Sequence, residues 1–188
     1  MRLAFIVLIS SLASVINTQT VYARAFVDHP VHSGKWTDEY DRHFKKYSKR
    51  YFGPLFDWHW FKAQAIAESA LKSDAKSHVG ARGLMQIMPG TFSDIVKKNP
   101  HFSKLETPKW NIAAGIYYDR TLYRKFKKTA AQDKLYMTFA SYNAGYGRIL
   151  NASKRTGSAE KNWDEIKPYL PKETRGYVSR IRRLMGEH

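Results

Sequence analysis

One apolar stretch, residues 57–72 with the sequence DWHWFKAQAIAESALK, constrains the fold more than any other part of this chain. It predicts a helix, because Asp57 is a suitable N-cap, no proline or glycine interrupts it, and alanine recurs along it. Apolar side chains leave little polar face, so we expect this helix to be mostly buried. It carries one glutamate, Glu68.

Two interpretations of Glu68 are open from the helix alone. A carboxylate that loses solvation has a raised pKa, which suits it to donate a proton near neutral pH. The alternative is a glutamate at the edge of the helix, solvated or paired with a cation.

The stretch that follows, residues 69–91 with the sequence SALKSDAKSHVGARGLMQIMPGT, predicts a turn-rich loop that returns beside Glu68. Gly80 and Gly83 permit positive φ or a close approach of backbone. Gln86, an uncharged donor and acceptor, lies inside the apolar run LMQIM. The loop therefore brings a polar amide toward the carboxylate.

Four blocks follow one another along the chain: Glu68-Ser69, then SHVGARGLMQIMPGT, then SYNAG at 141–145, then ETRGYV at 173–178. Together they resemble the soluble lytic transglycosylase family, which cleaves bacterial peptidoglycan. The resemblance spans roughly residues 58–185. It implies a single catalytic domain with a lysozyme-like fold of the α+β lysozyme superfamily and a sugar-binding cleft.

The resemblance also implies roles for particular residues. Glu68 matches the family's single catalytic acid, which protonates the oxygen between N-acetylmuramic acid and N-acetylglucosamine and then takes a proton from the muramoyl C6 hydroxyl, so that a 1,6-anhydro ring closes. Tyr142 matches the tyrosine that reaches the catalytic carboxyl group. The substrate-binding residues implied along the cleft are Ser77, Gln86, Met88, Tyr142, Asn143, Glu173 and Tyr177.

Several of these residues have plain structural alternatives. Ser77 could cap a turn, Gln86 could be a buried hydrogen-bonding group, and Met88 could belong to the core. Asn143 is expected to fix its turn rather than touch sugar. Glu173 could simply be an acidic residue favoured in the first turn of a helix.

Two positions depart from the family pattern. Arg82 occupies the variable place in GAxG and is expected to add charge near the cleft. Ser141 stands where alanine is common before YNAG. No histidine spacing such as HExxH occurs, and we expect neither a metal nor a cofactor.

Helical periodicity predicts a mainly α chain, without convincing strand pairs or an internal repeat. The predicted helices are 38–51, 57–72, from 89 to about 98, 111–128, 131–141, 147–154 and 173–185, with a short turn at 163–166. We expect Asn111 to cap the helix that begins there. The segment 100–109 is predicted to be a polar loop.

The N-terminus predicts export. Residues 1–23 combine Arg2, an apolar run and a small-residue end at Ala23, which is typical of a secretory signal peptide, with an uncleaved anchor as the alternative. The chain contains no cysteine, so a lipid-modified cysteine is excluded. We expect a protein that is soluble after signal cleavage, periplasmic or secreted, with a basic, partly helical extension at 24–54 packed on a catalytic domain at 55–188.

The formal net charge of +16 predicts an anionic partner. Basic residues cluster at 42–50, 124–128 and 180–183, where they could equally be solvated surface charge. The expected partners are peptidoglycan glycan strands, an anionic wall or membrane surface, and a secretion or conjugation machine. The rival functions are a hydrolytic muramidase on the same fold, a wall-binding protein without activity, and a nucleic-acid-binding protein, which export disfavours.

Overall fold

The computed structural model describes residues 30–157 and 162–187, and this part of the chain is mainly helical, as predicted. The predicted signal peptide lies outside the described residues. The elements are η1 (Pro30–His32), α2 (Asp41–Phe52), α3 (His59–Ser69), α4 (Pro89–Lys98), α5 (Pro108–Tyr123), α6 (Ala131–Ala144), α7 (Tyr146–Arg155), α8 (Trp163–Ile166), η2 (Lys167–Tyr169) and α9 (Lys172–Leu184).

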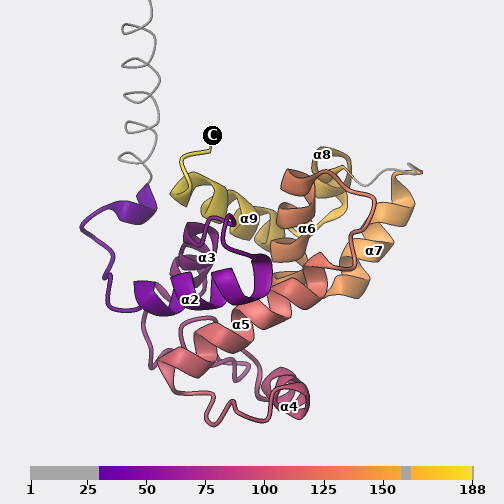
Figure 1. Ribbon diagram of the computed structural model, residues 1–188. Helices are drawn as coiled ribbons and strands as arrows, with labels where there is room; N and C mark the ends of the chain where they lie inside the picture. Colours follow the sequence, from indigo (N-terminus) through magenta and orange to yellow (C-terminus); the bar gives the residue numbers. More distant parts are fainter. Residues whose placement is uncertain (1–29, 158–161, 188) are drawn as a thin grey trace, which may run out of the picture.

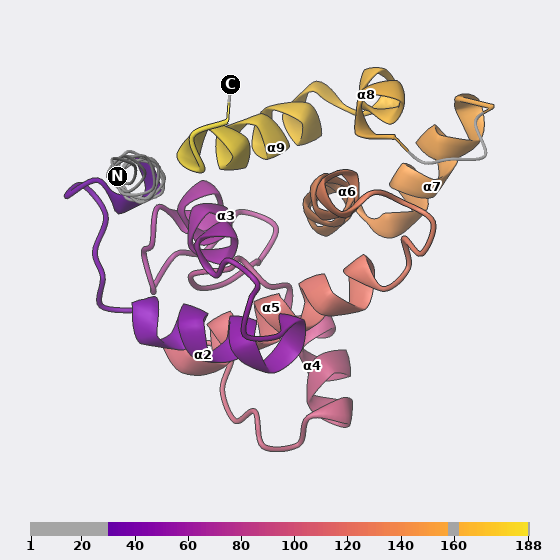
Figure 2. The same ribbon diagram turned by 45° about the horizontal axis from the view of Figure 1, so that its top comes forward.

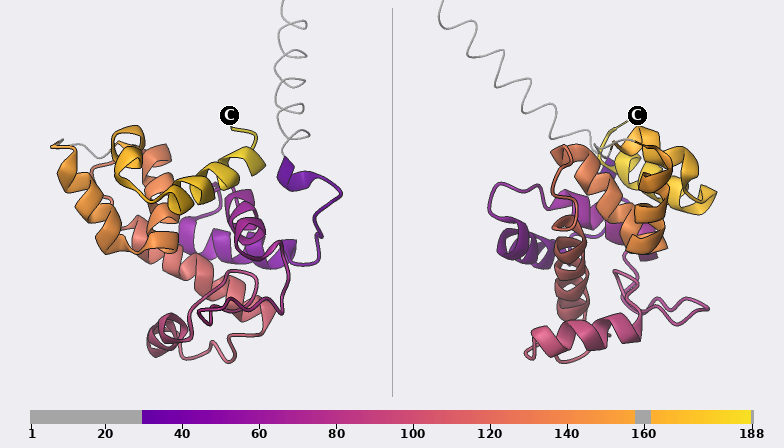
Figure 3. Two further views of the ribbon diagram at one scale, coloured as in Figure 1. Left: turned by 180° about the vertical axis from the view of Figure 1, so that it is seen from behind. Right: turned by 90° about the vertical axis from the view of Figure 1, so that its right-hand side faces the viewer.

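Helix α5 runs through the middle of the molecule and organises its neighbours (Figure 1). It packs against α2 on one side and against α6 on another. Helix α3 lies between α9 and α2 and packs against both (Figure 2). Helix α4 lies at the end of the molecule opposite α9 (Figure 3, right). Among the described residues, none of these helices is both long and apolar enough to cross a membrane.

Helix α3 is buried as predicted but shorter than predicted. Its residues 59 and 61–66 are buried, with Phe61 and Ile66 completely inaccessible. Asp57 lies just outside the helix, and its Oδ1 accepts a hydrogen bond from the His59 N–H at 3.0 Å. The helix ends at Ser69 because Ala70 and Leu71 turn to φ values of 53° and 60°, a left-handed conformation that helix propensity does not predict.

The prediction that Asn111 caps a helix is wrong. Helix α5 begins three residues earlier, with Thr107 as its N-cap and Pro108 in the first turn, where the fixed φ of proline suits a helix start. Asn111 lies inside the helix and is 1% exposed. Its side-chain amide makes hydrogen bonds to the loop at 73–88 and does not cap the helix. The helix also ends earlier than predicted, at Tyr123 rather than at residue 128.

Helix α2, which lies in the described part of the predicted extension, packs on the rest of the described chain, as predicted. Helix α2 buries Phe44 and Tyr47 in the same core that contains Phe139 of α6. Lys62 of α3 is nearly buried and pairs with Asp41 of α2, Nζ to Oδ1, at 2.8 Å. This ion pair ties α2 to α3, and the ring of Tyr51 in α2 packs edge-on against Tyr117 of α5.

The C-terminal helices bring the SYNAG and ETRGYV blocks to one side of the molecule. Helix α6 continues through Ala144, so Tyr142 and Asn143 lie in its last turn, and Gly145 ends it with φ of 85°. Helix α9 packs on both α3 and α6. The SYNAG tyrosine and the residues of α9 are thereby placed beside the end of α3.

The last described residue anchors this C-terminal helix. Glu187 accepts hydrogen bonds from the Tyr136 hydroxyl, from Gln132 Nε2 at 2.7 Å and from Arg182 Nε at 2.9 Å. Tyr136 and Gln132 belong to α6, so this carboxylate ties the end of α9 to that helix.

Candidate active site

Glu68 lies in the last turn of α3 and lines a cleft of about 610 Å³. All eight predicted site residues line this cleft, although they come from α3, the loop at 70–88, α6 and α9. The cleft is lined by Ala67, Glu68, Ser77, His78, Val79, Ala81, Gln86, Met88, Tyr142, Asn143, Glu173, Gly176, Tyr177 and Arg180.

The environment of Glu68 adjusts its protonation. Burial raises the pKa of this carboxyl group from 4.5 to about 7, and a hydrogen bond from Tyr177 works in the opposite direction. The Tyr177 hydroxyl donates to Glu68 Oε1 at 2.6 Å. With this pKa, Glu68 can hold or release a proton near neutral pH.

The tyrosine whose hydroxyl contacts Glu68 is Tyr177. The expectation that Tyr142 reaches this carboxyl group is wrong. The Tyr142 hydroxyl donates instead to the carbonyl oxygen of Met85 at 2.8 Å. Its ring packs edge-on against Tyr118. Burial is the largest cause of a raised pKa for both Tyr142 and Tyr177, and the charge of Glu68 adds to it. Both hydroxyls therefore remain protonated donors at neutral pH.

The loop at 73–88 forms one wall of the cleft without regular secondary structure. Ser77 Oγ accepts a hydrogen bond from the Ala81 N–H at 2.9 Å, so the turn-capping interpretation of Ser77 is correct and holds together with its place in the cleft. Gln86 Nε2 donates to the carbonyl oxygens of Ala75 and Gly83, at 3.1 and 2.9 Å. Gln86 therefore links two separate parts of the loop and also lines the cleft.

Asn111 of α5 holds this wall from behind. Its Oδ1 accepts from the Met85 N–H at 2.7 Å, and its Nδ2 donates to the carbonyl oxygens of Arg82 and Leu105, at 2.9 and 3.0 Å. Gly83, with φ of 76°, lets the loop approach, since an added Cβ would lie 2.7 Å from Asn111 Cγ. One buried amide therefore fixes the course of the loop.

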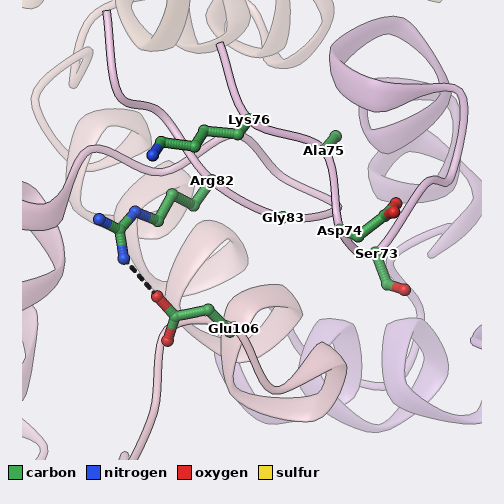
Figure 4. Close-up of a pocket in the computed structure, with 7 residues that line it drawn as sticks. All are labelled: Ser73, Asp74, Ala75, Lys76, Arg82, Gly83 and Glu106. Atoms are coloured by element: carbon green, nitrogen blue, oxygen red, sulfur yellow. Dashed lines mark hydrogen bonds and ion pairs between the residues drawn. The ribbon is translucent and has the colours of Figure 1, made fainter.

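Arg82 does not add charge to the cleft, contrary to expectation. Its side chain points to Glu106, with Nη1 and Oε1 at 2.6 Å, and lines a separate hollow of about 440 Å³ (Figure 4). Lys76 runs beside it, and Asp74 faces the same hollow (Figure 4). The backbone of Arg82 pairs with Ile87, and its side chain lines this hollow and not the cleft.

The rim of the cleft carries Met88, Asn143 and Glu173. Met88 is 42% exposed, so the core interpretation of this residue is wrong. Glu173 lies exposed in the first turn of α9. Among the described residues that line the cleft, it is the only carboxyl group besides Glu68.

Arg180 is a cleft residue that the sequence interpretation missed. Its guanidinium donates to the carbonyl oxygens of Ile66 and Ala67, at 3.2 and 3.3 Å. These carbonyls belong to the last turns of α3, so Arg180 anchors α9 beside Glu68. Its spacing of three residues from Tyr177 places both on one helix face and could have indicated it. Within residues 30–157 and 162–187, no three side chains are grouped as a metal site.

Comparison with known families agrees with this geometry. The model of the transglycosylase SLT domain matches residues 44–164, and the chain therefore belongs to that family. The membrane-bound lytic murein transglycosylase F of Vibrio vulnificus is 32% identical over 132 residues, which cover 68% of this chain and 23% of that protein. Its counterpart in Vibrio cholerae is 30% identical over 162 residues, which cover 74% of this chain and 29% of the relative.

Solved structures show the same fold. The 70 kDa soluble lytic transglycosylase of Escherichia coli superposes with a TM-score of 0.69 at 29% identity, over 90% of this chain and 27% of that one. An inactive mutant of the lytic transglycosylase Slt of Pseudomonas aeruginosa gives 0.68 at 24% identity, over 92% and 28%. The predicted lysozyme-like fold is confirmed. The chain spans about a quarter of the length of these relatives.

Proposed function

We propose that this chain is a peptidoglycan lytic transglycosylase that cleaves the β-1,4 bond between N-acetylmuramic acid and N-acetylglucosamine and leaves 1,6-anhydromuramoyl products. The observation that carries the proposal is the state of Glu68, a carboxyl group in a sugar-sized cleft with a pKa of about 7. Membership of the transglycosylase SLT domain family supports it.

In the proposed mechanism Glu68 acts twice. As the neutral acid it gives its proton to the glycosidic oxygen, and the bond between that oxygen and the muramoyl anomeric carbon breaks. As the carboxylate, stabilised by the Tyr177 hydroxyl, it takes the proton of the C6 hydroxyl while that oxygen bonds to the anomeric carbon. A pKa near neutrality serves both steps, because neither protonation state is strongly favoured.

A single carboxyl group suffices for this reaction. Ordinary glycosidases use two, one as acid and one as nucleophile or base, whereas here the C6 hydroxyl already lies beside the reacting carbon. Glu173, the other carboxyl group of the cleft, is exposed at the rim and lies in the favoured first turn of α9. We assign Ser77, Gln86, Met88, Tyr142, Asn143, Glu173 and Tyr177 to substrate binding.

The proposal includes the place where the enzyme acts. The relatives carry the names of lytic murein transglycosylases, which supports peptidoglycan as the proposed substrate. The proposed compartment is the periplasm or the exterior, where this substrate lies. Residues 1–23 are proposed as the export signal and residues 55–188 as the catalytic domain. The high positive charge would concentrate the protein at anionic wall or membrane surfaces in a salt-dependent manner.

Product analysis with two matched variants tests this function. Digestion of purified peptidoglycan is expected to release muropeptides that end in 1,6-anhydro-N-acetylmuramic acid, lighter by one water than hydrolytic products, which mass spectrometry resolves. Glu68→Gln should abolish the release, whereas Glu173→Gln, which changes a group assigned to substrate binding, should weaken binding and still release the same anhydro products. Reducing-end products alone would establish the rival muramidase, and full activity of Glu68→Gln would place the catalyst elsewhere.

A further inference from the structure

Asp119 is a carboxyl group in the middle of α5 that the proposed chemistry does not use. It is 0% exposed and, within residues 30–157 and 162–187, pairs with no cation, which is rare for an aspartate. The hydrogen bond described for it comes from Gln64 Nε2, which donates to Asp119 Oδ1 at 3.3 Å. Gln64 is also 0% exposed, so the two side chains form a closed polar pair within the core.

The pair leaves two acceptor atoms without a donor. Asp119 Oδ2 and Gln64 Oε1 are both buried and have no hydrogen-bond partner among the residues that the structure describes. An ionised carboxylate and an amide oxygen can only accept, so neither can satisfy the other while Asp119 is charged. A proton on Asp119 Oδ2 would convert this atom into a donor, for which the amide oxygen of Gln64 is an available acceptor. The acid and the amide would then each donate once and accept once.

The position of the pair connects it to the cleft. Gln64 precedes Glu68 by four residues on α3, so both side chains leave the same face of that helix, one turn apart. The ionisable groups that interact electrostatically with Asp119 are Glu68 of α3, Tyr118 of α5, Tyr142 of α6 and Tyr177 of α9. On the α2 side, Tyr51 packs against Tyr117 of α5. No cation appears among these groups.

We propose that Asp119 is a positioning residue for Glu68, held as a neutral acid that pairs reciprocally with Gln64 and fixes the face of α3 that enters the cleft. Its effect on catalysis rests on the proposed function of Glu68. Burial raises the pKa of Asp119 well above its usual range and outweighs the hydrogen bond from Gln64, which lowers this pKa. The charge of Glu68 adds a smaller increase.

Neutrality of Asp119 has a consequence for the reaction. A second negative charge behind Glu68 would favour the protonated form of that carboxyl group and oppose the step in which it acts as a base. The neutral pair supplies a rigid hydrogen-bonded support without that charge. Asp119 thereby orients Glu68 while leaving its proton exchange near neutral pH.

Two variants of Asp119 test whether this residue is a neutral hydrogen-bonding acid, an ionised carboxylate or a residue that only fills space. In Asp119→Asn the new amide can still accept from and donate to Gln64, so kcat should stay within about twofold of wild type and the pH profile should not move. In Asp119→Leu the Gln64 amide loses both partners, and kcat should fall about ten- to a hundredfold with little change in KM.

The opposite results would overturn the inference. A pH profile of Asp119→Asn displaced to lower pH would mean that an ionised Asp119 raises the pKa of Glu68 in wild type. An Asp119→Leu variant with unchanged kcat would mean that Asp119 positions nothing. If the leucine variant does not fold, the asparagine variant and the following titration decide.

The titration follows the ¹³C shift of the Asp119 carboxyl group in the wild-type protein without substrate, with the signal assigned by its absence from Asp119→Asn. We expect the shift of a protonated acid throughout the neutral range, without a titration step. A carboxylate shift at neutral pH refutes the neutral acid. Because this readout is independent of turnover, it still decides about Asp119 if Glu68→Gln proves active and the proposed function fails.

Discussion

Replacing Tyr177 by phenylalanine tests how the cleft adjusts Glu68. The lost hydroxyl donates to Glu68 Oε1 at 2.6 Å, and its hydrogen bond lowers the pKa of a carboxyl group that burial raises to about 7. Hydrogen bonds to charged groups contribute about 1.5–3 kcal/mol and those between neutral groups about 0.5–1.5 kcal/mol. The carboxylate therefore loses about 1 kcal/mol more than the neutral acid.

At 1.36 kcal/mol per pKa unit, that difference corresponds to about one pH unit. Because the pKa of Glu68 rises in Tyr177→Phe, the acid stays protonated to higher pH. The alkaline limb of kcat/KM should move upward by about one pH unit. The assay is the initial rate of muropeptide release at low substrate concentration, measured across pH.

Tyr142→Phe is the matched control. This tyrosine lines the same cleft, but its hydroxyl donates to the Met85 carbonyl oxygen and not to Glu68. Its alkaline limb should coincide with that of wild type, while its stability falls because a backbone carbonyl loses its donor. An unmoved limb in Tyr177→Phe, or the same displacement in Tyr142→Phe, would refute this account of Glu68.

Three further predictions concern stability. The pKa of Glu68 rises from 4.5 to about 7 on folding, so the unfolding free energy of the wild type should fall by about 3 kcal/mol as the pH rises between these values. In urea titrations, Glu68→Gln should therefore be more stable than wild type above pH 7 and match it below pH 4.5. Asn111→Ala should lower the unfolding free energy by about 1–3 kcal/mol for each buried partner left unpaired, measured against Asn143→Ala on the exposed rim. Glu187→Gln should lower the melting temperature by a few degrees through weaker bonds to Tyr136 and Arg182, and high salt should reduce the difference.

Local sequence signals predicted most helices because they act within one turn. Pro89 marks the start of α4, and Gly145 marks the end of α6, each through its own backbone preference. The end of α3 could not be predicted in this way. Ala70 and Leu71 favour a helix locally, yet both adopt positive φ where the chain leaves the helix for the loop that lines the cleft.

The membership of the cleft was predictable from the four sequence blocks, but the contacts within it were not. Choosing between Tyr142 and Tyr177 as the partner of Glu68 depends on how α9 lies across α3, which no local pattern records. Asp119 was missed although its spacing of three residues from both Ile116 and Leu122 places it on the buried face of α5. What the sequence could not show is its partner, Gln64 of α3.

The dependence of one cleft wall on Asn111 matters for protein engineering. The sequence of the loop at 73–88 suggests that it could be exchanged as one unit. Its course, however, is set by hydrogen bonds with the Asn111 side chain of α5 and by the space that Gly83 leaves for that side chain. A chimera that exchanges this loop for a relative's must transfer the matching residue of the later helix as well. Crossover points for recombination should therefore follow this contact and not the ends of the loop.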